Sequence, residues 1–419
     1  MLPVVHLGKC WIFDWIRPMR TLIPAENWDY SLKDLVEGLG SVLKRDEKDP
    51  VINIAKVGPC IPIRSGRAAI VAAIQTLKLG PQARIGVPLY SCPVVLKAVL
   101  KAGCRPVFID IEKETYCISP MDLSRKNKYI DAVIVIHMFG NLCDMAEVIK
   151  SAHGKPIIED CAQSLGSRSK QMMSGTMGDI GIFSFRSGKY LSVGEGGALY
   201  AKDRAIYSRL RSIVAAMESP SKNEELVHII KTYLRSKLRS RPLFGLIGAK
   251  IWTIYNQTTD HTAKTPILMG KIFIHDLQLA RRRLVVFEKF LAAHRENTEY
   301  FFNNLLLSSA LPCHEIPPNF SNRYAFPIAF TTAEERDAMA RYLFQKKIHT
   351  IKPYQDIVEL ASAYYGYTGD CPGAEKVAKT TLLLPNHSRL RKQELRYICE
   401  SFNSGWKEIR EQQPDTEVR

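Results

Sequence analysis

Two ionisable residues with complementary chemistry lie near each other in the sequence. Asp160 follows the apolar run Pro156–Ile158, which predicts a short buried strand that carries the carboxylate at its end. Lys189 follows a second predicted strand, Ile180–Phe185, and lies in a polar turn among glycines. A carboxylate can keep a pyridine nitrogen protonated, and an amine so placed can form a Schiff base with an aldehyde. The pair therefore suits pyridoxal 5′-phosphate.

Each residue also has a plainer interpretation. An Asp at the end of a strand is commonly a cap or a turn residue, and a Lys beside glycines is commonly a solvated loop residue. The order of groups favours the cofactor, because the acid is followed by an amide at Gln163 and a hydroxyl at Ser184 before the lysine.

The stretch from Pro156 to Gly197 resembles the DegT/StrS family of sugar aminotransferases, which are fold type I pyridoxal-phosphate enzymes. The matching residues are Glu159, Asp160, Ala162, Gln163, Gly178, Asp179, Phe183, Ser184, Phe185, Lys189, Leu191, Gly194, Glu195, Gly196 and Gly197. The resemblance implies that Lys189 forms the Schiff base and that Asp160 faces the pyridinium nitrogen. Gln163 would lie against the ring and its phenolic oxygen, and Ser184 would donate its hydroxyl to the phosphate. Some relatives carry His in place of this lysine and catalyse dehydration, so Lys189 favours amino transfer.

The phosphate is expected at the start of a predicted helix over Gly66–Leu79. The residues that lead into it are similar to the family's S-G-T motif, with Arg67 in the threonine position. A helix dipole and unpaired N–H groups favour an anion, so Ser65, Gly66 and Arg67 are predicted to bind the phosphate. Ser-Gly before a helix is also a common N-cap without any binding function.

Two further positions are predicted to lie near the ring or the substrate. Cys92 occupies the place where the family sets an aromatic residue over the pyridine face, and Tyr90 is a neighbour that partly substitutes for it and a candidate substrate contact. A buried structural thiol is the alternative for Cys92. His137 ends a predicted strand and is a second candidate substrate ligand; the alternative is a histidine that satisfies nearby backbone groups.

The composition indicates a globular protein with an unusual charge. The chain has 419 residues, of which 46% are hydrophobic, and a formal net charge of +16. Its ten cysteines are scattered without a C-x-x-C pair, so we expect reduced thiols in a cytoplasm and no metal site. Lys9, Asp14 and Arg17 interrupt the apolar residues near the N-terminus. We therefore expect neither a signal peptide nor a membrane-spanning helix.

Residues 65 to about 201 alternate predicted strands and helices, as in a mostly parallel sheet with crossover helices. The expected fold class is α/β, that of a fold type I pyridoxal-phosphate transferase. Residues 1–274 would form the large cofactor domain and residues 275–419 a smaller C-terminal α+β domain. The segment 205–270 departs from the family and reads as a basic insertion; the family's cross-subunit asparagine has no assignable counterpart, and Asn256 is too far from the next helix.

Within that insertion, residues 226–256 combine charge and apolar periodicity. Ile229, Ile230, Tyr233, Leu234 and Leu238 recur at helical spacing beside five Lys and Arg residues, and Trp252 and Tyr255 follow. Such a stretch predicts peripheral contact with the inner face of an anionic membrane. The alternative is a helix packed on the protein's own sheet or on a dimer mate. No nucleic acid is expected as a partner.

The resemblance implies transfer of an amino group from glutamate or glutamine to a keto-sugar, usually linked to a nucleotide, in the synthesis of amino sugars, surface polysaccharide or lipopolysaccharide. It also implies a homodimer, because the neighbouring subunit completes the active site of fold type I enzymes, and a long helix predicted over Asp276–Arg295 offers an apolar face for pairing. A sugar dehydratase and a non-catalytic cofactor-binding regulator are the alternatives. Lys189 disfavours the first, and retention of the motif disfavours the second.

Overall fold

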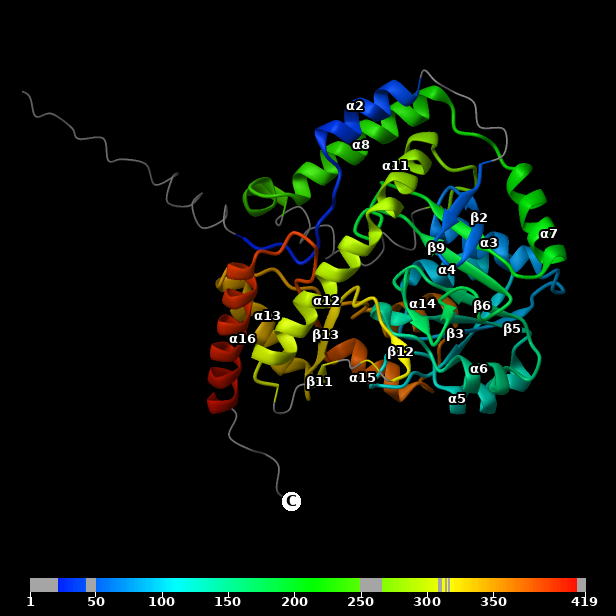
Figure 1. Ribbon diagram of the computed structural model, residues 1–419. Coiled ribbons are helices and arrows are strands. Elements are labelled where there is room, and N and C mark those ends of the chain that lie inside the picture. The colour runs from blue at the N-terminus through cyan, green and yellow to red at the C-terminus, as the bar shows by residue number, and fades with distance from the viewer. Residues whose placement is uncertain are drawn as a thin grey trace, which may run out of the picture.

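The computed structural model describes residues 22–42, 50–248, 266–307, 311–312, 315 and 317–412. Its largest element is an eight-stranded sheet with the order β1-β2-β10-β9-β6-β5-β3-β4 (Figure 1). These strands are β1 (Ile52–Ile54), β2 (Gly58–Ile63), β3 (Arg84–Pro88), β4 (Arg105–Ile109), β5 (Ala132–Ile136), β6 (Ile157–Asp160), β9 (Ile180–Ser184) and β10 (Gly197–Tyr200). β9, β6, β5, β3 and β4 pair in parallel, whereas β10, β2 and β1 join through antiparallel pairs. The predicted α/β fold with a mostly parallel sheet is confirmed.

The sequence of the central strands explains their place. All five residues of β5 are buried, as expected for a parallel strand covered by helices on both faces. The crossover helices are α3 (Gly66–Thr76), α4 (Pro93–Lys101), α5 (Pro120–Lys126) and α6 (Met145–Ala152), and α7 (Arg204–Ala215) packs on α3. The carboxyl ends of β6 and β9 therefore lie at one edge of the sheet and carry Asp160 and Ser184 there.

A smaller antiparallel sheet forms the C-terminal part. Its strands are β11 (Leu311–Pro312), β13 (Phe326–Ala329) and β14 (Thr381–Leu384). The surrounding helices are α12 (Phe287–Asn304), α13 (Ala333–Gln345), α14 (Ile357–Tyr365), α15 (Pro372–Thr380) and α16 (Lys392–Gln412). A third, short sheet joins the two parts, because β12 (Asn319–Phe320) pairs with β7 (Arg168–Ser169), which in turn pairs with β8 (Met172–Met173).

Two segments pack across the boundary predicted at residue 274. Helix α11 (Ile274–Val285) buries Leu277 and Ala280 in the same core cluster as Ile52 of the large sheet. Ile23, near the start of the described chain, bridges to Ile348 in the core of the C-terminal part. The single helix predicted over Asp276–Arg295 is also two helices, since α11 ends before Val286 and α12 begins after it.

The basic insertion contributes helix α8 (Lys222–Arg239) and a short π-helical turn, Phe244–Gly248. Helix α8 lies beside α2 (Leu32–Ser41) at the top of the molecule and also contacts α11 (Figure 1). Trp252, Tyr255 and Asn256 lie outside the described residues. Within the part of the chain that the structure describes, no helix is both long enough and apolar enough to cross a bilayer.

Candidate active site

Asp160 is the last residue of β6 and its side chain is buried. Its Oδ1 atom accepts a hydrogen bond from the backbone N–H of Ala162 at 2.9 Å. Burial raises the pKa of Asp160, while the N–H of Ala162 and the charge of Lys189 act in the opposite direction. A buried carboxylate needs a positive partner, so this position suits a protonated ring nitrogen.

Lys189 lies in the turn after β9, where its backbone N–H donates to the carbonyl oxygen of Arg186. Burial is the main cause that lowers the pKa of Lys189 to about 8; the charge of Arg186 also lowers this pKa, whereas Cys92 and Asp160 act in the opposite direction. Its Nζ atom lies 4.8 Å from the centre of the Tyr324 ring. A lysine with this pKa is partly neutral near physiological pH, which is the form that acts as nucleophile and base.

Gln163 lies in the turn after β6 and its amide is fully engaged. Its Oε1 atom accepts from the backbone N–H of Phe139 at 3.0 Å, and its Nε2 atom donates to the Tyr354 hydroxyl at 2.9 Å. Burial raises the pKa of Tyr354 well above its usual value, and Cys92 adds to the effect. The structure therefore brings Gln163, Tyr354 and Cys92 into one neighbourhood.

The predicted phosphate site lies where α3 begins. Ser65 is the N-cap of α3, and its hydroxyl accepts from the N–H of Ala68 at 3.2 Å. A methyl group added to Gly66 would lie 2.9 Å from the Cβ atom of Ser184 and 3.1 Å from its Oγ atom. Glycine thus permits the start of the helix to approach Ser184 closely, and the first N–H groups of α3 are left without helical partners. Arg67 lies 3.7 Å from Glu195, so its charge is shared with that carboxylate.

Cys92 and Tyr90, which the sequence places near the ring, differ in their surroundings. Cys92 is the N-cap of α4 and is half-buried, without a side-chain capping bond. Tyr90 is fully buried, donates its hydroxyl to the carbonyl oxygen of Pro353 at 3.2 Å and packs against Tyr354 with ring centres 5.4 Å apart. Tyr90 thus packs against Tyr354. Its side chain is fully buried, which does not fit the substrate contact predicted for it.

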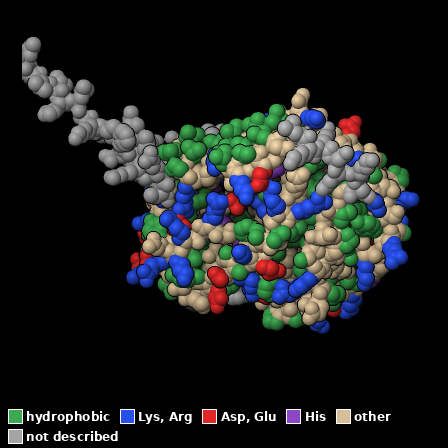
Figure 2. Space-filling view, turned by 45° about the horizontal axis from the view of Figure 1, so that its top comes forward, with side chains coloured by type: hydrophobic (Ala, Val, Ile, Leu, Met, Phe, Trp, Pro, Cys, Tyr) green, Lys and Arg blue, Asp and Glu red, His purple; other side chains and the backbone are tan. Residues whose placement is uncertain are grey.

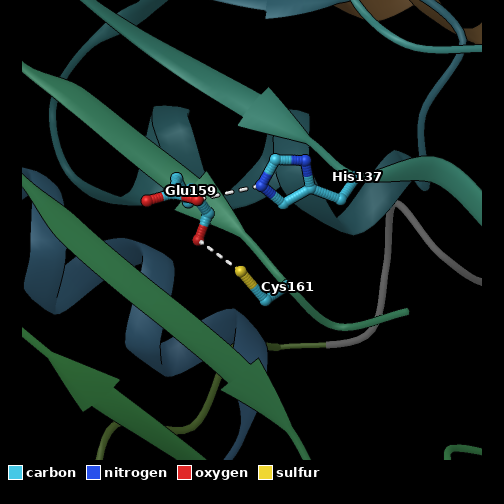
Figure 3. Close-up of side chains that lie close together, drawn as sticks. All are labelled: His137, Glu159 and Cys161. Carbon is cyan, nitrogen blue, oxygen red and sulfur yellow. Dashed lines mark hydrogen bonds and ion pairs between the residues drawn. The ribbon is translucent and has the colours of Figure 1, made fainter. Parts of the chain in front are cut away.

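The substrate contact predicted for His137 does not fit the structure either. The side chain is fully buried; Nδ1 accepts from the N–H of Cys143 at 3.2 Å, so Nε2 carries the proton and donates to Glu159 at 2.9 Å. The same carboxylate accepts backbone N–H groups from Gly175, Met177 and Gly178. Figure 3 shows His137, Glu159 and Cys161 converging. Glu159 thus anchors the loop before β9, and the bond of His137 to the Cys143 N–H matches the alternative interpretation, a histidine that satisfies nearby backbone groups.

A cavity of about 730 Å³, counting its open mouth, lies beside Lys189. Its walls come from the segment before α2, the turn that carries Lys189, helices α11 and α12 and the C-terminal sheet. The polar residues that line it are Glu26, Asn27, Asp29, Lys189, Tyr190, Ser192, Arg283, His294, Tyr324, Asn386, His387 and Ser388. The Nδ1 atoms of His294 and His387 are buried and have no hydrogen-bond partner among the described residues. The polar side chains that line the cavity suit a polar ligand.

Tyr324, Tyr354 and His387 are site residues that the sequence did not identify. Nothing in their spacing along the chain relates them to Lys189. Tyr324 reaches the site because its hydroxyl donates to the carbonyl oxygen of Gly188 at 2.9 Å.

Comparisons with known proteins agree with this site. The model of the DegT/DnrJ/EryC1/StrS aminotransferase family matches residues 50–245 and 257–403. GDP-perosamine synthase of Escherichia coli O157:H7 is 25% identical over 346 residues, which cover 81% of this chain and 84% of that protein. L-glutamine:2-deoxy-scyllo-inosose aminotransferase of Micromonospora echinospora is 30% identical over 163 residues, only 38% of this chain and 39% of that protein. The PLP form of Spr1654 from Streptococcus pneumoniae has a TM-score of 0.73 at 18% identity and covers 93% of this chain and 99% of that one.

The residues present fit pyridoxal phosphate. Gly66 lets the start of α3 approach the Ser184 hydroxyl closely, Asp160 offers a buried carboxylate, and Lys189 offers an amine that is partly neutral near physiological pH. When bound, the cofactor supplies an aldehyde for the amine and a ring that accepts electrons. The family model covers both parts of the fold. This chain therefore belongs to the DegT/DnrJ/EryC1/StrS aminotransferase family and is a pyridoxal-phosphate-dependent aminotransferase.

Proposed function

We propose that the chain transfers an amino group from glutamate or glutamine to a keto-sugar linked to a nucleotide, and that the product serves surface polysaccharide, lipopolysaccharide or amino-sugar synthesis. The observation that carries the proposal is the position of Lys189, whose amine borders a polar cavity. A sugar presents many hydroxyl groups, and polar side chains that can bond them, such as Asn27, Asn386 and Ser388, line the cavity.

The chain's own residues divide the work of the reaction. Lys189 gives up a proton near physiological pH, so its amine can take a proton from the substrate carbon and return it elsewhere. Asp160 holds positive charge on the ring nitrogen through a buried carboxylate. The N–H groups at the start of α3 and the Ser184 hydroxyl would hold the phosphate of the cofactor.

The relatives support a sugar or sugar-like acceptor. One is named for GDP-perosamine, which is a nucleotide-linked amino sugar, and another for a glutamine donor and a cyclic keto-polyol acceptor. A third, UDP-N-acetyl-3-dehydro-alpha-D-glucosamine 3-aminotransferase of Acidithiobacillus ferrooxidans, also carries a nucleotide in its name. These names favour a nucleotide-linked keto-sugar as the acceptor and glutamate or glutamine as the donor.

The donor half of the reaction gives a direct test. Purified protein loaded with pyridoxal phosphate is mixed with glutamate or glutamine, and the absorbance of the cofactor is followed while the keto-acid product is measured. A panel of nucleotide-linked keto-sugars and scyllo-inosose then identifies the acceptor. The proposal predicts conversion of the cofactor by one donor and its return by a keto-sugar. If no donor converts the cofactor, or if a keto-sugar is dehydrated without gaining nitrogen, the proposal is wrong.

The assembly and the location belong to the same proposal. We place the protein in the cytoplasm as a homodimer, because the resemblance implies a site completed by a neighbouring subunit. Helices α11 and α12 bury Leu277, Leu291 and Phe301 within the chain itself, so these three side chains do not form the pairing surface. Light scattering on the purified protein measures the assembly directly, and a fully active monomer would contradict the dimer.

A further inference from the structure

Helices α2 and α8 present apolar side chains on their outer surface. On α2 these recur at i, i+4 and i+7, and on α8 they lie within two successive turns. The set consists of Leu32, Val36 and Leu39, exposed by 58%, 61% and 38%, and Leu226, Val227, Ile230 and Leu234, exposed by 38%, 46%, 42% and 54%. We call these seven residues the outer apolar face. Single exposed apolar residues are ordinary, whereas a contiguous group on two adjacent helices indicates a binding surface.

The side of α8 that packs on the protein is a different one. Ile229, Thr232 and Ser236 are buried, and the Ser236 hydroxyl donates to the carbonyl oxygen of Trp28 at 2.6 Å. On α11, Asp276 bonds His228 of α8 at 2.7 Å. Helix α8 therefore packs on the protein itself, as the alternative interpretation of its sequence proposed. This packing leaves the outer apolar face uncovered by the described residues.

The charges around this face are mainly positive. The exposed charged side chains of the two helices are Lys33, Lys222, Glu224, Lys231 and Arg235, and Lys33 pairs with the partly exposed Glu37 at 3.8 Å. Glu224, the acidic member, is held at the start of α8 by the N–H of Ser221. Figure 2 shows the hydrophobic side chains gathered on the upper part of the molecule, where α2 and α8 lie in Figure 1, with Lys and Arg side chains next to them.

We infer that the outer apolar face binds the surface of an anionic phospholipid bilayer. An apolar face flanked by basic residues suits a helix that lies in the membrane interface, where acyl chains bury the apolar groups and lipid phosphates attract the cations. A second copy of the chain fits less well, because a twofold contact brings the same basic residues toward one another and each chain carries a net charge of +16. This binding goes beyond the proposed function and does not depend on it.

Not every cation of the basic segment takes part. Arg239 is buried, with its guanidinium 4.6 Å from the Trp28 ring and 3.8 Å from Glu26. Arg241 pairs with Glu394. Replacing these two would disturb the fold, so Lys231 and Arg235 are the informative positions on α8.

The chain offers a matched pair of variants for the test. Ile230 and Lys231 are adjacent and exposed on α8, and Ile149 and Lys150 are adjacent and exposed on α6, with the two isoleucines exposed by 42% and 47%. The test variant is Ile230→Gln with Lys231→Gln, and the control is Ile149→Gln with Lys150→Gln. Both proteins, together with the intact chain, are floated with vesicles of phosphatidylcholine alone or mixed with phosphatidylglycerol, at low and high salt. Donor conversion and light scattering are measured on the same samples.

We expect the intact chain and the control to float with the anionic vesicles at low salt and the test variant to lose at least tenfold in bound fraction. Each Lys or Arg near an anionic surface contributes a factor of about five, and loss of Ile230 adds to this. Failure of the intact chain to float overturns the inference, as does equal loss in the control. If the test variant becomes a monomer while its flotation is unchanged, the face joins two copies of the chain instead. Unchanged donor conversion in the test variant shows that the fold and the proposed activity are intact.

Discussion

The Nζ atom of Lys189 lies 4.8 Å from the centre of the Tyr324 ring, and the Tyr324 hydroxyl donates to the carbonyl oxygen of Gly188, the residue before that lysine, at 2.9 Å. One tyrosine thus contacts both the amine and the backbone that carries it. Tyr324 comes from the segment before β13, so the C-terminal part of the chain fixes a group supplied by the large sheet.

Lys189→Arg is expected to abolish covalent attachment of the cofactor and to lower turnover by about 10³-fold or more, because arginine keeps the charge but is not a nucleophile near neutral pH. Borohydride reduction followed by peptide mass analysis locates the attached lysine. Lys170→Arg is the control, since Lys170 is exposed in the loop before β9. Attachment at any other lysine contradicts the assignment.

Asp160→Asn is expected to retain the cofactor and to lose about 10² to 10⁴-fold in turnover. The amide cannot hold the proton of the ring nitrogen by charge, and this loss is felt mainly in the transition state. Absorbance titration gives the cofactor affinity, and steady-state kinetics give kcat. If the variant turned over as fast as the intact protein, Asp160 would not be needed to hold the proton of the ring nitrogen.

The pH dependence of cofactor uptake follows from the pKa of Lys189. Only the neutral amine attacks an aldehyde, and burial lowers its pKa from 10.5 to about 8. The rate of attachment to cofactor-free protein should therefore rise with pH and level off above about 8, as stopped-flow absorbance can show. A rate that keeps rising toward pH 10.5 would show an ordinary lysine.

Arg186 gives that pH profile a second test. Its charge helps to lower the pKa of Lys189. Arg186→Gln should move the midpoint of the profile to higher pH, and Arg186→Lys should leave it in place. The difference between these variants should shrink at high salt, because Arg186 is exposed and its charge is screened.

Gly66→Ala is expected to weaken cofactor binding and to destabilise the fold by about 1 to 3 kcal/mol, since its methyl group would lie 2.9 Å from the Cβ atom of Ser184. Gly80→Ala is the matched control, because nothing lies within 4 Å of a methyl group there. Cofactor titration and thermal unfolding measure the two effects. Equal cofactor affinity and equal thermal stability of the two variants would mean that the absence of a side chain at Gly66 is not required.

His387→Asn is expected to raise KM for the acceptor by about tenfold and to leave the donor half-reaction unchanged. The Nε2 atom of His387 contacts the carbonyl oxygen of Pro24 at 3.2 Å and must donate to it, so the unpartnered Nδ1 atom is an acceptor for a substrate hydroxyl. His153→Asn is the control, because His153 is exposed and has a left-handed backbone that Asn tolerates. A change in donor conversion would indicate a structural role instead.

Local patterns predicted the large sheet well. Apolar runs such as Ala132–Ile136 are buried strands, and the predicted helix from Gly66 begins at that residue and ends at Thr76, three residues earlier than expected. The motif residues from Asp160 to Lys189 lie between the end of β6 and the turn after β9, and β6 and β9 are neighbours in the sheet, so this short segment brings them together. The same reasoning could not identify Tyr324 or His387, which reach the site through tertiary packing.

His137 shows the opposite failure. The end of a strand near a ligand site predicts a polar contact, and the sequence does not reveal that Glu159 and the N–H of Cys143 take both ring nitrogens. Helix α8 was predicted from its periodicity, but its buried side was not. Ile229 faces inward and Ile230 outward because α2 and α11 occupy the space on one side, and neither neighbour can be inferred from residues 226–241.

The walls of the cavity beside Lys189 have a thermodynamic consequence. Gly188 and Ser192 come from the large sheet's turns, whereas Ile351 and Leu383 come from the C-terminal part. A molecule that fills the space touches both parts at once and favours the arrangement in which they are docked. Acceptor binding should therefore slow amide hydrogen exchange around β14 as well as around the Lys189 turn. One ligand would then protect amides in both parts of the protein.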